Sequence, residues 1–279
     1  MTDTDTLATL LILTSALLHA SWNAATKRTE NKLGTIAFMS IFGSLLYIPF
    51  VPFFPLPHGV MWAFIFASVT AHIVYQLALA RALELGDLTF IYPIARGLGP
   101  LLVGVFSLLF LSGTLSLPEF LAILTLVGGI FLTISARAGS AKAFIAAVIS
   151  GVMIATYTLV DGFAVKSVDE PMIFIIWGAL TFSPIFAAYL TLIHGRSFLK
   201  DSLSTWRVSL PIALLAQSGY ALALYALSLG DIGEIAALRE TSIVFATLIG
   251  ALWLKEDIPG KKMIAVLLIA IGAISLKLV

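Results

Sequence analysis

The chain has 279 residues, of which 60% are hydrophobic and 11% charged, and its mean hydropathy is +1.06. A water-soluble domain cannot bury so much apolar surface, so the composition predicts an integral membrane protein. The 16 basic and 15 acidic residues nearly balance, which gives no basis for nucleic-acid binding, and the absence of cysteine excludes disulfides, thiolate metal sites and cysteine nucleophiles.

Ten stretches of the chain are long and apolar enough to cross the hydrocarbon as helices. Spanning takes roughly 20 residues, because every backbone amide must be satisfied within its own segment. The apolar runs are continuous rather than alternating, so a β-barrel is disfavoured. The first run lacks a basic leader segment, and we expect it to be retained as a span. In chain order, the expected spans are Leu7–Thr26, Leu33–Val51, Gly59–Leu83, Leu88–Leu111, Leu117–Ser135, Ala143–Val165, Met172–Ile193, Val208–Leu229, Ile232–Leu254 and Pro259–Leu278.

Short polar segments separate these stretches. The longest of them, Gly195–Trp206, has about a dozen residues. Loops of this length make consecutive helices antiparallel neighbours and leave no room for an active site outside the membrane. The sequence therefore predicts an all-α membrane bundle without soluble domains.

An internal repeat divides the chain into two similar halves. Residues 82–87 read ALELGD and residues 226–231 read ALSLGD, so the link between the third and fourth spans recurs between the eighth and ninth. We therefore predict ten transmembrane helices in two five-helix repeats, residues 1–138 and 139–279, within one integrated membrane domain. Because five is odd, the second repeat enters from the opposite side, which makes the repeats inverted.

Inverted halves can exchange conformations, so that a central site opens first to one side of the membrane and then to the other. The repeat therefore predicts a transporter that works by alternating access. A duplication that was retained only for packing is the alternative. Because one chain holds both repeats, we expect a functional monomer.

Ionisable side chains are predicted to lie deep in the membrane. Arg96 falls about eight residues into the fourth span, roughly 12 Å down at 1.5 Å per residue, and the repeat alignment places Glu240 at a similar depth in the ninth. We expect Arg96 and Glu240 to approach each other, as an ion pair or as anchors for the two ends of a zwitterionic solute. Arg239 is a third candidate, about 100° around the helix from Glu240. A salt bridge that serves packing alone is the alternative.

Polar and aromatic side chains at helical spacing complete the expected solute site. His19, Trp22 and Asn23 share one face of the first span, and Tyr157 and Asp161 share one face of the sixth. The alternatives are that His19 merely bonds to a neighbouring helix and that Asp161 is solvated at its helix end. The remaining candidates that we expect to line the site are His72, Tyr75, Gln76, Tyr92, Gln217 and Tyr220.

The fourth span contains Pro93, Gly97, Gly99 and Pro100, which weaken a helix. Proline frees backbone groups and glycine permits bending. We expect these residues to break the helix and to act as a gating element. A static kink is the alternative.

Two stretches carry a resemblance to a known family. One is His19-Ala20-Ser21-Trp22-Asn23 running to Lys27, and the other is Ile91-Tyr92-Pro93-Ile94-Ala95-Arg96-Gly97-Leu98-Gly99-Pro100. Together with the ten helices and the five-plus-five repeat, they resemble the drug/metabolite transporter superfamily in its EamA-domain branch. The first stretch is similar to a subgroup associated with phosphonate utilisation. The resemblance implies a proton-coupled or facilitative carrier of amino acids, nucleotide-like metabolites or other small polar compounds, with its site in a central cavity.

The predicted function is secondary transport of an amino-acid-like or other zwitterionic or anionic solute, with Glu240 as a hypothetical proton-coupling group beside Arg239 and Arg96. An exporter of lipophilic cations and drugs is the first alternative, and an intramembrane lipid-modifying enzyme is a remote one. No catalytic constellation is apparent, so we expect no enzyme. We also expect no metal or cofactor, because the four histidines lie on separate segments: His19, His58, His72 and His194.

Positive residues concentrate after the odd-numbered spans. By the positive-inside rule, this distribution predicts a multi-pass protein of the inner cell membrane with both termini outside. The residues concerned are Lys27, Arg28, Lys32, Arg137, Lys142, Arg196, Lys200, Arg207, Lys255, Lys261 and Lys262.

Overall fold

The computed structural model describes residues 3–86, 88–111, 115–134, 140–195, 197–253, 255 and 259–278. Within these residues every element of secondary structure is a helix, and each predicted apolar stretch contains at least one helix. The predicted ends of the fifth and ninth spans, Ser135 and Leu254, lie outside the described residues. The elements are α1 (Asp3–Lys27), α2 (Lys32–Phe42), η1 (Gly43–Phe53), α3 (Val60–Leu85), α4 (Leu88–Phe110), α5 (Leu117–Leu132), α6 (Ala141–Lys166), α7 (Met172–His194), α8 (Ser197–Ser204), α9 (Trp206–Leu229), α10 (Ile232–Arg239), α11 (Ser242–Leu252) and α12 (Gly260–Leu278).

Two of the predicted spans are not continuous α-helices. The second begins as α2 and changes at Gly43 into the 3₁₀-helix η1, which contains Pro49 and Pro52. Each proline removes an amide donor that an α-helix would use, which favours the different pairing. The ninth span consists of α10 and α11, with a break at residues 240–241. The polar segment Gly195–Trp206 is also not a loop throughout, because it contains helix α8.

Eight segments in the described ranges are long and apolar enough to cross a membrane. Helix α5 is apolar but has only 16 residues, and α12 carries Lys261, Lys262 and Lys277. The chain is therefore a membrane protein. The eight segments are Asp3–Lys27, Gly34–Phe53, Val60–Leu85, Phe90–Phe110, Ala141–Lys166, Met172–Ile193, Trp206–Leu229 and Ile232–Leu252.

Apolar side chains cover the outside of the bundle, and several charged side chains lie inside it. Phe53, Leu192 and Leu252 are among the large apolar residues that are exposed, whereas Arg96 and Asp161 are buried. A water-soluble protein shows the opposite distribution. The outer surface suits contact with lipid, and the interior can hold a polar site.

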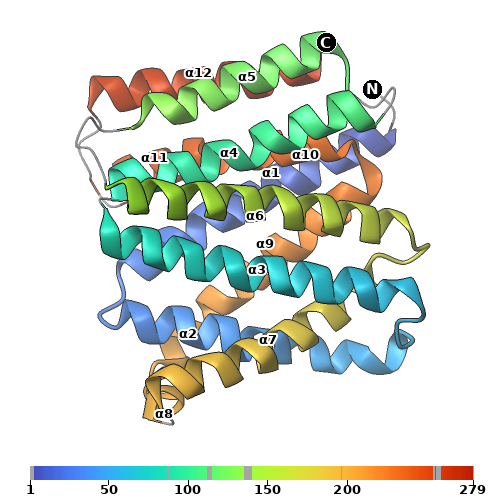
Figure 1. The fold of residues 1–279 in the computed structure, drawn as a ribbon, viewed down its shortest axis with the longest axis vertical. Helices are drawn as coiled ribbons and strands as arrows, with labels where there is room; N and C mark the ends of the chain where they lie inside the picture. The colour runs from blue at the N-terminus through green and yellow to red at the C-terminus, as the bar shows by residue number, and fades with distance from the viewer. Residues whose placement is uncertain are drawn as a thin grey trace.

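Helices from the two halves of the chain pack against each other. Helix α1 packs along α9, α3 packs along α6, and α5 packs along α12. Helix α4 packs on α6, and α1 packs on α10 and α11. Figure 1 shows α4, α6 and α3 following one another across the bundle, with α5 and α12 together at one edge. These contacts bring the midsections of α4, α6 and α10 together.

Small residues allow α1 to lie close to α9. Ala8, Ala16 and Ala20 are on the buried face of α1, and Ser15 donates a hydrogen bond of 2.6 Å to the carbonyl oxygen of Gly219. Lipid chains are as apolar as the helix side chains, so helices in a membrane associate through close packing and interhelical hydrogen bonds. The α1–α9 contact uses both.

Glycines bring the backbones of α5 and α12 into contact. A Cβ atom added to Gly129 would lie 2.8 Å from the carbonyl oxygen of Ala265, and one added to Gly272 would lie 2.6 Å from the amide nitrogen of Leu126. The residues of α12 that lie three and seven positions before Gly272 face Gly129. The residues of α5 that lie three and seven positions before Gly129 face Gly272, so the contact is reciprocal. No larger residue fits at either position without separating the helices.

We expect Gly272→Ala to destabilise the protein by about 1–3 kcal/mol, because the new methyl group meets backbone atoms that cannot move aside. The control is Gly128→Ala, where the added Cβ atom has no neighbour within 4 Å and the change should stabilise the helix by about 0.5–1 kcal/mol. Thermal unfolding in detergent measures both. Equal effects of the two variants would contradict the close contact.

Candidate functional site

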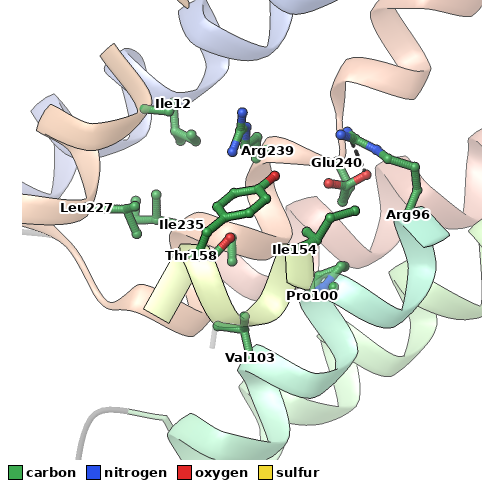
Figure 2. Close-up of a pocket in the computed structure, with 14 residues that line it drawn as sticks. Ile12, Arg96, Pro100, Val103, Ile154, Thr158, Leu227, Ile235, Arg239 and Glu240 are labelled. Carbon is green, nitrogen blue, oxygen red and sulfur yellow. Dashed lines mark ion pairs between the residues drawn. The ribbon is translucent and has the colours of Figure 1, made fainter. Parts of the chain in front are cut away.

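A small cavity lies inside the bundle between α1, α4, α6, α9 and α10 (Figure 2). Its volume is about 20 Å³, which is room for about one water molecule. Charged and polar groups meet apolar side chains on its wall. The lining residues are Ile12, Arg96, Gly99, Pro100, Val103, Ile154, Tyr157, Thr158, Ala223, Leu227, Ile235, Ala236, Arg239 and Glu240.

An ion pair joins α4 to the break between α10 and α11. Arg96 Nη2 lies 2.9 Å from Glu240 Oε2, which is the contact marked in Figure 2, and the residues are only 8% and 4% exposed. Arg96 Nη2 also donates a hydrogen bond of 3.3 Å to Ser242 Oγ. The prediction that Arg96 and Glu240 approach each other is therefore confirmed.

The hydrogen-bonding capacity of this ion pair is only partly used. Arg96 Nε and Glu240 Oε2 have no hydrogen-bond partner in the part of the chain that the structure describes. The contact of 2.9 Å joins the two groups through Arg96 Nη2 and leaves Arg96 Nε without a partner. Buried charges normally satisfy their donors and acceptors, so this pair keeps capacity for a further ligand.

Arg239 brings a second guanidinium group to the cavity. Its Nε atom has no hydrogen-bond partner, and the described residues contain no ion pair to this side chain. The guanidinium carbon lies 5.9 Å from the ring centre of Tyr220, within the range of a cation–π interaction. Figure 2 shows Arg239 and Glu240 leaving the end of α10 in different directions, as their spacing predicts.

The break in the ninth span is built from tight turns. The amide of Glu240 donates to the carbonyl oxygen of Ala237, and the amide and hydroxyl of Thr241 both donate to that of Leu238. These bonds connect residues three apart, as in a 3₁₀-helix. They end α10 at Arg239 and place the carboxylate of Glu240 toward α4.

The expected break in the fourth span is wrong. Helix α4 continues without interruption through Pro93 and Pro100. Its glycines serve close packing: a Cβ atom at Gly97 would lie 2.5 Å from Phe131 of α5, and one at Gly99 would lie 2.5 Å from Ile154 of α6. Packing on both sides supports the helix past its prolines. A gating role for these four residues stays a prediction.

A second and larger cavity of about 160 Å³ lies between α3, α7 and α9. Four of the predicted site residues line it: His72, Gln76, Gln217 and Tyr220. Helix α7 contributes apolar residues and a hydroxyl group to the opposite wall. The lining residues are Ser68, Val69, His72, Gln76, Phe174, Ile175, Gly178, Ala179, Phe182, Ser183, Ala216, Gln217, Tyr220 and Leu224.

Hydrogen bonds connect side chains of three helices beside this second cavity. Tyr220 Oη donates to Asp161 Oδ2 at 2.7 Å, and it lies 3.3 Å from His72 Nε2. His72 Nδ1 lies 2.9 Å from the carbonyl oxygen of Ser68. The imidazole also stacks on the ring of Tyr157, with 3.9 Å between the ring centres. Asp161 is 1% exposed and is not solvated at the helix end, which was the alternative to its role in the site.

Six predicted site residues line neither cavity: His19, Trp22, Asn23, Tyr75, Tyr92 and Asp161. The side-chain amide of Asn23 donates to the carbonyl oxygen of His19 in its own helix. Trp22 packs against an apolar cluster of α2 and α9. Tyr75 contacts the ring of Tyr157, and Tyr92 lies 6.0 Å from the guanidinium carbon of Arg96. These residues surround the site without lining a cavity.

Three residues near the site were not predicted from the sequence: Ser68, Phe182 and Ser242. Ser68 could have been found, because it precedes His72 by one helical turn. Phe182 contacts the ring of His72 from α7, and no regularly spaced polar residues in that helix indicate a site. Ser242 reaches Arg96 only because the helix is interrupted beside Glu240. The described residues contain no group of three or more His, Asp or Glu side chains arranged to hold a metal ion.

We expect Arg96→Met or Glu240→Met to cost about 3–5 kcal/mol of stability, because each leaves a buried charge without its partner. The double variant should be more stable than either single variant and should still lack transport. The control is Arg81→Met, which removes the exposed Arg81–Glu84 pair and should cost about 0–1 kcal/mol. Normal transport by the double variant would show that the buried pair serves packing alone. Unfolding in detergent and uptake into liposomes are the measurements.

Comparisons with known proteins agree with the helical architecture. The model of the EamA-like transporter family matches the chain twice, at residues 6–135 and 141–277. A solved structure titled only "Crystal structure of protein" shares the fold, with a TM-score of 0.74, 19% sequence identity, and coverage of 97% of this chain and 98% of that chain. No curated protein matches. Because the two family matches together span most of the chain, the protein belongs to the EamA-like transporter family.

Proposed function

We propose that this protein is a secondary transporter of a small anionic or zwitterionic metabolite and works by alternating access. The observation that carries the proposal is the group of three charged side chains at the central cavity. Arg96 and Glu240 form a buried ion pair, and Arg239 stands beside them without a partner among the described residues.

The cost of these charges supports a functional role. An ionisable side chain at the middle of a membrane costs about 2.5–3.5 kcal/mol on insertion scales, and such residues usually mark a pathway or a binding site. A pair kept for packing would need no third charge. The unpaired guanidinium of Arg239 offers a place for a carboxylate or phosphonate group of a solute, and Glu240 offers a place for an amine.

The arrangement of the repeats also supports transport. The reciprocal contact of Gly129 and Gly272 is the contact expected when α5 and α12 are antiparallel and related by a twofold axis. In Figure 1, α1 and α6 cross the bundle in opposite directions. Both features favour two inverted repeats. The number of membrane spans is ten when α2–η1 and α10–α11 are each counted as one span and α5 and α12 are counted as shorter spans.

The size of the cavities indicates that the solute site is closed in this structure. The central cavity of about 20 Å³ is too small for an amino acid, and the second cavity of about 160 Å³ lies to one side of the ion pair. Glu240 is 4% exposed, so a solute of this size can reach its carboxylate only when helices separate. This requirement agrees with a transport cycle in which the site opens to one side at a time.

The charges favour a metabolite carrier over an exporter of lipophilic cations. A site for cations should be dominated by acidic and aromatic groups, and the central cavity instead contains two guanidinium groups and one carboxylate. The proposal includes insertion in the inner cell membrane, action as a monomer and no enzymatic activity. The similarity to the phosphonate-associated subgroup remains a prediction.

Uptake by purified protein in liposomes tests the proposal. The panel consists of L-alanine, L-aspartate, 2-aminoethylphosphonate and uridine, which represent zwitterionic, anionic and neutral polar solutes. We expect uptake of an anionic or zwitterionic member. Arg239→Gln should weaken its apparent affinity about 10- to 100-fold, as expected for loss of a charge-assisted hydrogen bond. Arg207→Gln is the control, because Arg207 is exposed at the start of α9.

Two results would contradict the proposed function. One is that none of the four solutes enters liposomes that contain well-folded wild-type protein. The other is that Arg239→Gln and Arg207→Gln transport equally well, which would remove Arg239 from the site.

Single-cysteine labelling tests the orientation, and the chain has no native thiol to interfere. We expect an impermeant maleimide to label Thr4→Cys and Asp169→Cys in intact cells, because both positions should face outward. Lys200→Cys on α8 should react only after permeabilisation. All three positions are exposed. Labelling of Lys200→Cys alone would reverse the orientation, and labelling of Asp169→Cys and Lys200→Cys from the same side would contradict a single crossing by α7.

A further inference from the structure

We infer that His72, Tyr220 and Asp161 form a proton-binding relay that couples proton entry to entry of an anionic solute. The inference rests on the proposed transport function and deepens it. The three side chains come from α3, α9 and α6, and Tyr220 Oη connects the other two, at 2.7 Å from Asp161 Oδ2 and 3.3 Å from His72 Nε2.

The protons of this relay can be counted from its geometry. The carbonyl oxygen of Ser68 can only accept, so His72 Nδ1, 2.9 Å away, carries a hydrogen. Ser68 Oγ lies farther from the same nitrogen, at 3.3 Å, and then acts as a second acceptor. The hydroxyl group of Tyr220 has one hydrogen and can donate it to one neighbour. When the hydroxyl group of Tyr220 donates its hydrogen to an ionised Asp161, its oxygen faces the lone pair of Nε2 on a neutral His72. Neither atom then has a hydrogen for this contact, so the contact is not a hydrogen bond.

One added proton completes the relay in either of two arrangements. In the first, His72 is doubly protonated, its Nε2 hydrogen is donated to Tyr220 Oη, and Tyr220 donates to ionised Asp161. In the second, Asp161 carries the proton and donates it to Tyr220 Oη, while the hydroxyl hydrogen is donated to neutral His72. Passing a proton from Asp161 to Tyr220, and the hydroxyl proton from Tyr220 to His72, converts the second arrangement into the first.

The surroundings of Asp161 favour binding of that proton. Its Oδ1 atom has no hydrogen-bond partner in the described part of the chain, and the residue is 1% exposed. A buried carboxylate with one oxygen that accepts no hydrogen bond is poorly compensated for the loss of water. A proton removes the net charge of the relay without requiring a movement of any helix.

Arg239 links the relay to the solute. The relay has a net charge of −1 without the added proton and 0 with it, while Arg239 is positive and lies 5.9 Å from the ring centre of Tyr220. The negative charge of the proton-free relay therefore compensates the positive charge of Arg239. Protonation removes this compensation and leaves the guanidinium group free to attract an anion. Proton and anion then favour each other's binding, and this coupling is reciprocal.

The other titratable or charged groups around the relay do not replace this role. Tyr157 stacks on His72 from α6, Tyr75 on α3 contacts Tyr157, and His19 on α1 lies within the field of the two arginines. The ion pair of Arg96 and Glu240 is internally neutral. Helix α7 faces the second cavity with apolar residues, Gly178 and the hydroxyl group of Ser183, none of which titrates near neutral pH.

The relay occurs in one half of the chain only. The alignment on residues 82–87 and 226–231 places Ala216 opposite His72 and Gln76 opposite Tyr220. Alignment of α1 and α6 on their last residues, Lys27 and Lys166, places Trp22 opposite Asp161. None of these three replacements ionises near neutral pH. The sequence therefore provides one such relay, and we expect one proton to enter with each solute molecule.

Two transport assays on the full-length protein separate proton coupling from solute binding. Accumulation driven by a pH gradient, inside alkaline, requires proton movement, whereas counterflow exchange of the panel solute at equal pH does not. We expect Asp161→Asn to lower gradient-driven accumulation about 10-fold or more and to lower counterflow much less. Tyr220→Phe should also lower accumulation. The controls are Asp201→Asn on exposed α8 and Tyr225→Phe on the exposed face of α9.

Affinity measured by thermal shift supplies a matching test. The apparent affinity of wild-type protein for the anionic or zwitterionic solute that it transports should fall as the pH rises, because the relay loses its proton. Asp161→Asn imitates the neutral relay, so its affinity should not depend on pH. Over the pH range in which the wild-type affinity changes, potentiometric titration of solute-free protein in detergent should count one proton fewer in Asp161→Asn/His72→Gln than in wild type.

Each outcome distinguishes the relay from the proposed function. Wild-type uptake that is indifferent to the pH gradient would overturn the relay and leave the transport proposal intact. Gradient-driven accumulation that survives in Asp161→Asn or Tyr220→Phe would also overturn it. If none of the panel solutes enters, the transport proposal fails, and the titration still decides whether the three residues bind the proton. An unchanged proton count in Asp161→Asn/His72→Gln would then overturn the relay independently.

Discussion

The ion pair between Arg96 and Glu240 is the interaction on which the interior of this protein depends. Neither charge could remain inside an apolar bundle alone, so α4 and the break between α10 and α11 must stay in register. The break itself ends one helix and starts another at the depth where the carboxylate is needed. Because Arg96 belongs to the first half of the chain and Glu240 to the second, the two halves are held together by charge at their centre as well as by packing.

The helices and the central pair could be predicted from the sequence because both depend on local or repeated patterns. Apolar runs of about 20 residues define helices in a membrane almost regardless of their neighbours. The ALELGD and ALSLGD segments fixed the alignment that placed Arg96 opposite Glu240, and the structure confirms their approach. The family match at residues 6–135 and 141–277 confirms the duplication that this alignment assumed.

The remaining features depend on tertiary contacts that no local pattern reveals. Prolines indicated a break in α4, but packing of Gly97 and Gly99 against α5 and α6 keeps that helix continuous, while tight turns interrupt the ninth span without any proline. The face that holds His19, Trp22 and Asn23 was recognisable as polar. The contacts of this face could not be predicted, because Asn23 forms a hydrogen bond within its own helix and Trp22 packs in an apolar cluster.

The crossing of α5 and α12 restricts how the proposed transport cycle can proceed. These helices come from different repeats, and at Gly129 and Gly272 they touch backbone to backbone. Sliding would force side chains into a space that admits none, whereas a small rotation about the crossing point keeps the contact. The glycine crossing would then act as a fulcrum at one edge of the molecule, and helices farther from it would travel the longest distances.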